Sequence, residues 1–284
     1  MRLLTFIFLL LLASGCVRYG RLKDSVDLPR KLNECSGLTT LDGDTLWLIE
    51  DGGNADNLYG INPEGSIVAT FEVSNAKNED WEALTSDAAG NVYIGDFGNN
   101  KSKRKDLVIH KLPNPHLEKG DKIPAKKIRF KYPDQKEFPP DFANRRFDAE
   151  AFFHSEGRLY IITKNQADPF NGKAYVYSVS DEPGQYTAKA EFQFDTCPQR
   201  SSCRVTDAAL SPSGDRLVLL GYGKLWVFEN FRKQRFGTGP TRTIDLGATT
   251  QLEAICFGRE DLLYIADERI FKSGGHLYTF PLPR

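Results

Sequence analysis

Beyond residue 20 the chain is a succession of short apolar runs separated by turns rich in Gly, Asp, Asn and Pro. The runs contain many Val, Ile, Leu, Tyr and Phe residues, and few segments show the period of an amphipathic helix. This pattern predicts an all-β domain.

One kind of run recurs at long intervals, as a carboxylate, a small residue and a large apolar residue. It is seen in WEALTSD (81–87), AEAFFHS (149–155) and LEAICFG (252–258), and CSGLTTL (35–41) and DAALSPS (207–213) align with it. Two further runs follow each copy, and a fourth follows four of the five copies. Four-strand units repeated in this way are typical of the blades of a β-propeller, with the recurring run as the innermost strand.

The fifth unit lacks its outer strand, since the chain ends soon after HLYTFPL. An amphipathic run that belongs to no blade, GRLKDSVDLP (20–29), precedes the first unit. We expect this N-terminal strand to complete the last blade and close the ring, which leaves no long unpaired edge. The prediction is a single propeller of five four-stranded blades. Six blades is the alternative, because the motif spacing is longest between residues 100 and 146.

The first sixteen residues have a different composition. MRLLTFIFLLLLASGC contains one Arg, an apolar run too short to span a membrane, and small residues that end on Cys16. This is the pattern of an export signal, and its end resembles a bacterial lipobox, in which the Cys is acylated. We expect a signal peptide at 1–15, a lipidated tether at 16–20 and the propeller at 21–284. An ordinary cleaved signal with an unmodified Cys is the alternative.

Cysteine usage agrees with export. Cys197 and Cys203 bracket a short loop that an oxidising compartment would close as a disulfide. Cys35 and Cys256 are either a second pair or two buried thiols. The formal net charge of -1 and the lack of an extended basic run give no reason to expect nucleic-acid binding.

In a propeller, the starts of the innermost strands and the loops between the second and third strands share one end of the channel. The sequence places a polar rim there, made of Glu34, Glu50, Asp51, Asn54, Asp80, Glu82, Asp96, Asn99, Asn100, Asp148, Glu150, Lys164, Asn165, Asp207, Glu253, Asp267, Glu268 and Arg269. Two carboxylates about 5 Å apart repel by roughly 3 kcal/mol at an effective dielectric of 20. The rim therefore needs a bound cation, raised pKa values, or pairing with Lys164 and Arg269.

Oxygen ligands without His or Cys suit a hard ion such as Ca²⁺. The candidate metal ligands are Asp80, Glu82, Asp96, Asp148, Glu150 and Glu253. The alternative for each carboxylate is a structural one, in which it accepts hydrogen bonds from backbone N–H groups of the next blade. The His residues lie outside any nucleophile motif, so a Ser/His/Asp hydrolase is not expected.

The segments CSGL, DWEAL, GDFGNN, DAEAF, TDAALSPSGD and LEAIC, in this order, resemble a family of exported bacterial β-propeller lipoproteins of unassigned function. More remotely they are similar to the SdiA-regulated and esterase-like phytase propellers. The nearer resemblance implies several acyl chains on Cys16, and Val17 at the next position favours the outer membrane. The remoter resemblances imply calcium binding and, for the phytases, phosphomonoester hydrolysis.

Two functions of different classes follow. The first is a membrane-anchored module that binds a small molecule or a protein at the channel mouth, with Ca²⁺ fixing the loops, and it is expected to be a monomer. The second is a metal-dependent hydrolase at the same acidic site, of phosphoesterase or esterase-like type. Its catalytic candidates are Lys164, Arg269 and Glu150.

Overall fold

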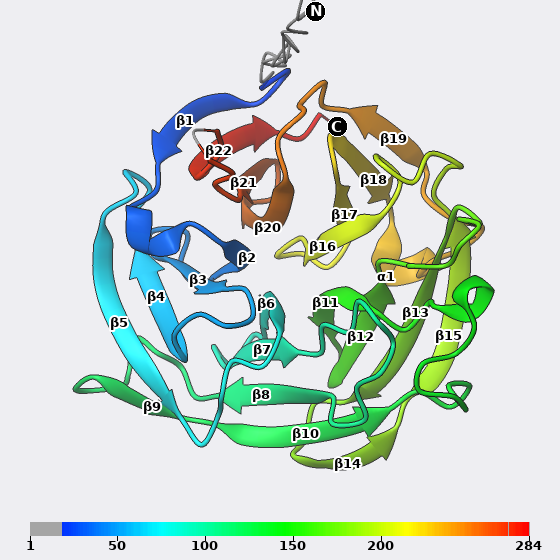
Figure 1. Ribbon diagram of the computed structural model, residues 1–284. Helices are drawn as coiled ribbons and strands as arrows, with labels where there is room; N and C mark the ends of the chain where they lie inside the picture. The colour runs from blue at the N-terminus through cyan, green and yellow to red at the C-terminus, as the bar shows by residue number, and fades with distance from the viewer. Residues whose placement is uncertain (1–18, 272, 284) are drawn as a thin grey trace, which may run out of the picture.

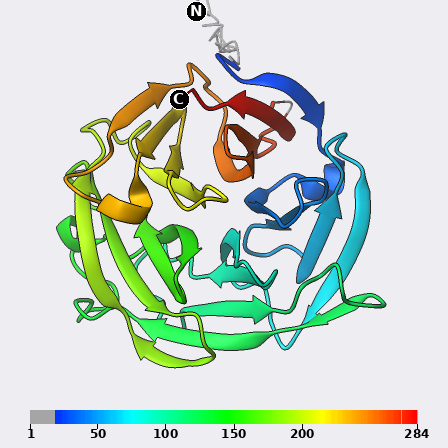
Figure 2. The same cartoon turned by 180° about the vertical axis from the view of Figure 1, so that it is seen from behind.

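The computed structural model describes residues 19–271 and 273–283, and it is a five-bladed β-propeller. Five sheets surround a central channel, each with its first strand innermost (Figure 1; Figure 2 shows the opposite face). The predicted fold class and blade number are confirmed, and the alternative of six blades is excluded. The predicted signal peptide and Cys16 lie outside the described residues.

Each blade is built on four antiparallel strands, named here from the channel outward. Blade one contains β2 (Cys35–Thr40), β3 (Leu46–Glu50), β4 (Asn57–Ile61) and β5 (Ile67–Ser74). Blade two contains β6 (Trp81–Ser86), β7 (Val92–Asp96), β8 (Val108–Leu112) and β10 (Lys126–Lys131). Blade three contains β11 (Ala149–Ser155), β12 (Arg158–Thr163), β13 (Lys173–Ser180) and β15 (Lys189–Asp195). Blade four contains β16 (Val205–Leu210), β17 (Leu217–Gly221), β18 (Lys224–Phe228) and β19 (Arg242–Asp245).

The fifth blade is shared between the two ends of the chain. Its inner strands are β20 (Leu252–Arg259), β21 (Leu262–Asp267) and β22 (His276–Pro281), and its outer strand is β1 (Lys23–Asp27). Strand β1 lies beside β22 in Figure 1. The two strands pair antiparallel, with Asp27 opposite His276. The predicted closure of the ring by the N-terminal strand is confirmed.

Two short strands leave their own blades and were not predicted. Strand β9 (Lys122–Pro124) pairs in parallel with β5 of blade one, and β14 (Gly184–Thr187) pairs in parallel with β10 of blade two. In Figure 1 they lie on the outside of the ring. They are too short to show an alternating apolar pattern, and their partners come from a neighbouring blade. Together they tie blades one, two and three to one another.

Helical structure is limited to single turns in the described part of the chain. These are η1 (Arg30–Leu32), η2 (Phe142–Asn144) and α1 (Phe231–Gln234). No helix among the described residues is long and apolar enough to cross a membrane.

The hydrophobic core lies between the faces of adjacent blades. One cluster joins Trp47 of blade one to Trp81 and Ile94 of blade two, and all three side chains are buried. Trp81 therefore packs between blades, and its indole N–H donates to the Lys77 carbonyl at 3.1 Å. A disulfide joins Cys197 and Cys203, as predicted, while Cys35 and Cys256 are separate buried thiols.

Candidate functional site

One end of the channel gathers carboxylates from all blades except the fourth. The starts of β6, β11 and β20 supply Asp80, Glu82, Glu150 and Glu253, and the loops after β3, β12 and β21 supply the others. We call this group the acidic mouth: Asp51, Asp80, Glu82, Glu150, Glu253, Glu268 and the ammonium group of Lys164. Six carboxylates thus face one lysine.

The acidic mouth encloses a cavity of about 50 Å³. Its lining consists of Ser36, Asp51, Glu82, Asn100, Glu150, Lys164, Glu253 and Glu268. A water molecule occupies about 30 Å³ in the liquid, so the cavity admits an ion and one or two waters. The opposite end of the same strands opens into a wider hollow of about 700 Å³, whose base includes Leu38, Ile255 and Phe257.

Asp51, Asp80 and Glu82 form one group within the acidic mouth. One carboxylate oxygen from each lies within 4.8 Å of the other two. Gly98 makes this approach possible, because a Cβ atom there would clash with the carboxylates of Asp80 and Glu82. The three side chains form a cluster of oxygen atoms of the kind that binds a hard cation.

Glu82 is only 7% exposed, and its carboxyl group lies in hydrogen-bonding contact with that of Glu150. It lines the cavity, and its carboxyl neighbours are those of Glu150 and Asp51. Burial, followed by the charge of Glu150, raises the pKa of Glu82 well above its ordinary range. Burial and then Asp51 raise the pKa of Asp80 to about 6. Two buried carboxyl groups in contact require either a shared proton or a cation between them.

The other side of the acidic mouth is neutralised by Lys164. Its Nζ lies 3.0 Å from Oε2 of Glu150 and 4.0 Å from Oε2 of Glu253. Burial alone would lower the pKa of Lys164, but Glu150 and Glu253 raise it well above its ordinary value, so the side chain is charged. The Tyr222 hydroxyl donates to Oε1 of Glu253 at 2.6 Å.

Asp148 and Asp207 each accept a backbone hydrogen bond from a neighbouring blade. Asp148 accepts the backbone N–H of Asn99 at 2.7 Å on one oxygen and the Gln166 amide at 2.6 Å on the other. Asp207 accepts the backbone N–H of Ile255 at 2.7 Å. The structural alternative raised by the sequence therefore describes these two residues. Asp148, a candidate metal ligand, lies beside the acidic mouth with both oxygens engaged.

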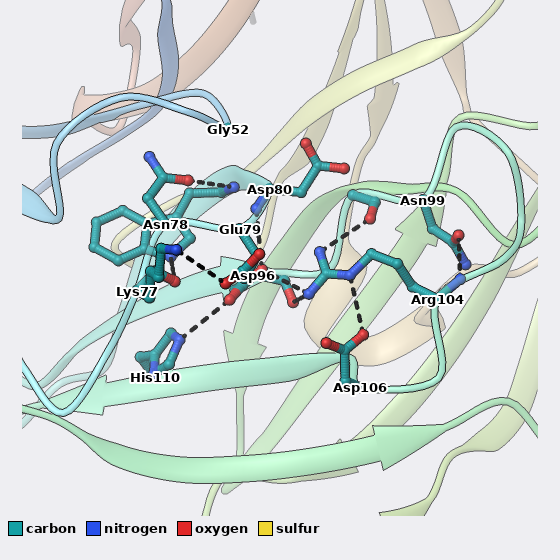
Figure 3. A network of polar contacts seen from close by, with 12 residues as sticks. Gly52, Lys77, Asn78, Glu79, Asp80, Asp96, Asn99, Arg104, Asp106 and His110 are labelled. Carbon is teal, nitrogen blue, oxygen red and sulfur yellow. Dashed lines mark hydrogen bonds and ion pairs between the residues drawn. The ribbon is translucent and has the colours of Figure 1, made fainter.

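Asp96 belongs to a separate network shown in Figure 3. Its Oδ1 accepts from Arg104 at 2.8 Å and from the backbone N–H of Asp80 at 3.2 Å, and its Oδ2 lies 3.5 Å from His110. The carboxylate of Asp80 points away from these contacts and takes part in none of those drawn in Figure 3. Asp96 thus holds the backbone of Asp80, while the carboxylate of Asp80 stays outside this network.

Arg269 is turned away from the cavity. Its guanidinium donates to the side chain of Asn33 at 3.0 Å and to the carbonyls of Leu28 and Gly275, each at 3.2 Å. These contacts hold the segment between β1 and β2 against the fifth blade. Of the two predicted rim cations, only Lys164 lines the cavity.

Two residues near the acidic mouth were not predicted. Tyr222 lies in the turn between β17 and β18, and Arg204 precedes β16. The Tyr222 ring contacts two cations, with Lys164 Nζ 5.6 Å and Arg204 Cζ 5.7 Å from its centre. The fourth blade has Ala208 where blades two, three and five have Glu. The repeated acidic motif therefore did not indicate Tyr222 or Arg204 as residues of the site.

Comparison with known proteins supports the fold. No protein-family model matches the chain, and no curated protein matches it. Among solved structures, the PQQ-bound aldose sugar dehydrogenase of Streptomyces coelicolor is similar, with a TM-score of 0.53 and 12% identity over 93% of this chain and 99% of that chain. Virginiamycin B lyase of Staphylococcus aureus aligns with a TM-score of 0.42 and 14% identity, over 93% of this chain and 75% of that chain. At such low identity the likeness to the dehydrogenase concerns the propeller fold alone.

Proposed function

We propose that this chain is an exported lipoprotein whose propeller is a binding module with one Ca²⁺ in the acidic mouth. The observation that carries the proposal is the cluster of Asp51, Asp80 and Glu82 beside a cavity of about 50 Å³. The candidate ligand atoms are all oxygen, and no Lys or Arg in the described part of the chain forms an ion pair with these three carboxylates. Ca²⁺ would stabilise the loops that present this end of the propeller to a partner.

The proposed anchor rests on the sequence at Cys16. Acylation there would place the propeller at a membrane surface, with the outer membrane favoured by Val17. Mass spectrometry of the protein extracted from membranes is the test, and acyl chains on an N-terminal Cys16 are expected. A mature N-terminus elsewhere, without lipid, would exclude the anchor.

Hydrolysis at the same site is the weaker candidate. A phosphoesterase would need cations to neutralise a phosphate, and Arg269 is held by Asn33 and backbone carbonyls. Lys164 is already paired with Glu150. Pockets for organic ligands commonly measure about 300 to 1,000 Å³, so the cavity at the acidic mouth is too small for an enclosed organic substrate. These observations favour binding over catalysis.

Thermal unfolding with Ca²⁺ or with chelator tests the cation. A ligand that binds only the folded state raises the midpoint, so the wild type should unfold at a higher temperature in Ca²⁺. Glu82→Gln should lose most of that increase. The control is Glu137→Gln. Glu137 is an exposed glutamate in the loop after β10, outside the acidic mouth, and this variant should respond to Ca²⁺ as the wild type does. An unchanged wild-type midpoint would remove the calcium site.

A phosphatase assay separates the two functions. The binding module should hydrolyse p-nitrophenyl phosphate no faster in Ca²⁺ than in chelator. Turnover that depends on Ca²⁺ and disappears in Glu82→Gln would establish the hydrolase instead.

A further inference from the structure

The acidic mouth has two sides that differ in how their charge is compensated. On one side, Asp51, Asp80 and Glu82 bring three carboxylate oxygens within 4.8 Å of one another, and no lysine or arginine among the described residues forms an ion pair with them. On the other side, Glu150 and Glu253 share the ammonium group of Lys164. The two sides meet where Glu82 and Glu150 face each other.

Lys164 is held in place by its surroundings. Its side chain is 10% exposed, and its backbone N–H donates to the Asp148 carbonyl at 2.8 Å. The Tyr222 ring lies beneath the ammonium group, and the Tyr222 hydroxyl fixes Glu253. The positive charge is therefore a fixed part of the site. If it moved into solvent, the repulsion between the carboxylates of Glu150 and Glu253 would be left uncompensated.

The carboxylates that contact Nζ would have to move inward to bind an ion in its place. Carboxylate oxygens of Glu150 and Glu253 lie 3.0 and 4.0 Å from it, and Ca²⁺ binds oxygen at about 2.3 to 2.6 Å. For Ca²⁺ at this point, Oε2 of Glu150 would move inward by about 0.4 to 0.7 Å and Oε2 of Glu253 by about 1.4 to 1.7 Å. Oε1 of Glu150 is buried and has no hydrogen-bond partner among the described residues, so it is available as a further ligand.

We propose that Lys164 is a built-in cation that fills the second of two cation positions in the acidic mouth. This inference rests on the proposed function, which assigns the first position to Ca²⁺ at Asp51, Asp80 and Glu82. With a neutral side chain at residue 164, Glu150 and Glu253 would bind a second divalent ion. Lys164 therefore sets both the number of ions and the net charge of the site.

Counting bound Ca²⁺ by equilibrium dialysis and elemental analysis tests the proposal, with the full chain in detergent micelles. The wild type and Lys164→Arg should hold one ion, because both keep a positive charge at residue 164. Lys164→Met should hold two. Lys164→Met combined with Glu82→Gln should return to one, now bound by Glu150 and Glu253. Lys173→Met is the matched control, because Lys173 pairs with Asp195 at 3.2 Å on the outer part of blade three, and it should hold one.

The outcomes separate the two ideas. A wild type that binds no ion removes the proposed function itself. A wild type with one ion and Lys164→Met with one ion of equal affinity leaves the calcium site standing and overturns the role of Lys164.

A second variant decides the matter if Lys164→Met does not fold even in Ca²⁺. Glu253→Gln keeps Lys164 and keeps an acceptor for Tyr222, and it alters only the side that Lys164 neutralises. Its Ca²⁺ affinity should stay within about threefold of the wild type. A loss of tenfold or more would mean that Glu253 binds the first ion, and the division of the site into two positions would be wrong.

Discussion

The carboxylate of Asp207 accepts the backbone N–H of Ile255 at 2.7 Å, across the boundary between the fourth and fifth blades. Its other oxygen accepts the N–H of Ala208 at 2.8 Å, and the side chain is fully buried. Asp207→Ala would leave two buried donors without an acceptor. The free energy of unfolding should fall by about 2 to 4 kcal/mol, measured by urea denaturation.

Asp215→Ala is the control for this measurement. Asp215 lies in the exposed turn between β16 and β17, and its carboxylate has no partner in the described structure. Its replacement should change stability by no more than about 0.5 kcal/mol. Equal losses in both variants would show that Asp207 does not join the blades.

Gly98→Ala should weaken the cation site directly. The added methyl group would meet the carboxylates of Asp80 and Glu82, and these would have to move apart. Ca²⁺ affinity should fall by tenfold or more, as measured by calorimetric titration, while the circular dichroism spectrum stays that of a β protein. Unchanged affinity would place the ion away from these two residues.

Glu268 should make stability depend on pH when no cation is bound. Burial and then Glu253 raise the pKa of Glu268 to about 8 from an ordinary 4.5. The folded protein therefore keeps a proton that the unfolded chain releases, so stability is lost as the pH rises from about 4.5 through about 8. Urea midpoints in chelator should fall across this range, and less steeply in Glu268→Gln. Parallel curves for the two proteins would contradict the assignment.

Cys35 and Cys256 should be unreactive in the folded protein. Both thiols are buried, and burial raises the pKa of each well above its ordinary value. Iodoacetamide modifies the thiolate, so peptide mass spectrometry should find neither residue alkylated in native buffer and both alkylated in denaturant. Rapid labelling of either in native buffer would show that the interface between blades one and five opens.

The strand pattern was enough to predict the fold, including its least local feature. The sequence contains five inner strands but only four outer strands, so the outer position of the fifth blade was unfilled. Residues 20–29 were the one amphipathic run not assigned to a blade. Strand β1 indeed occupies that place. Strands β9 and β14 could not be predicted in this way, since they pair with blades to which their sequences do not belong.

The site was predictable in position but not in its internal pairing. Repeats place Glu82, Glu150 and Glu253 at equivalent points, so their convergence follows from the ring. Which carboxylates are already satisfied depends on single contacts, such as Arg104 with Asp96 and Asn99 with Asp148. No repeat encodes these contacts, because each comes from a loop unique to one blade.

The closure of the ring by β1 has a mechanical consequence. Residues just before β1 also contact neighbouring strands: the N–H of Arg21 donates to the Leu246 carbonyl at 2.7 Å, and Tyr19 packs 5.8 Å from the ring of Tyr278. Tension applied at the N-terminus would reach these contacts first and then the pairing of β1 with β22. Under load the ring would open at the fifth blade, while blades one to three stay joined by β9 and β14.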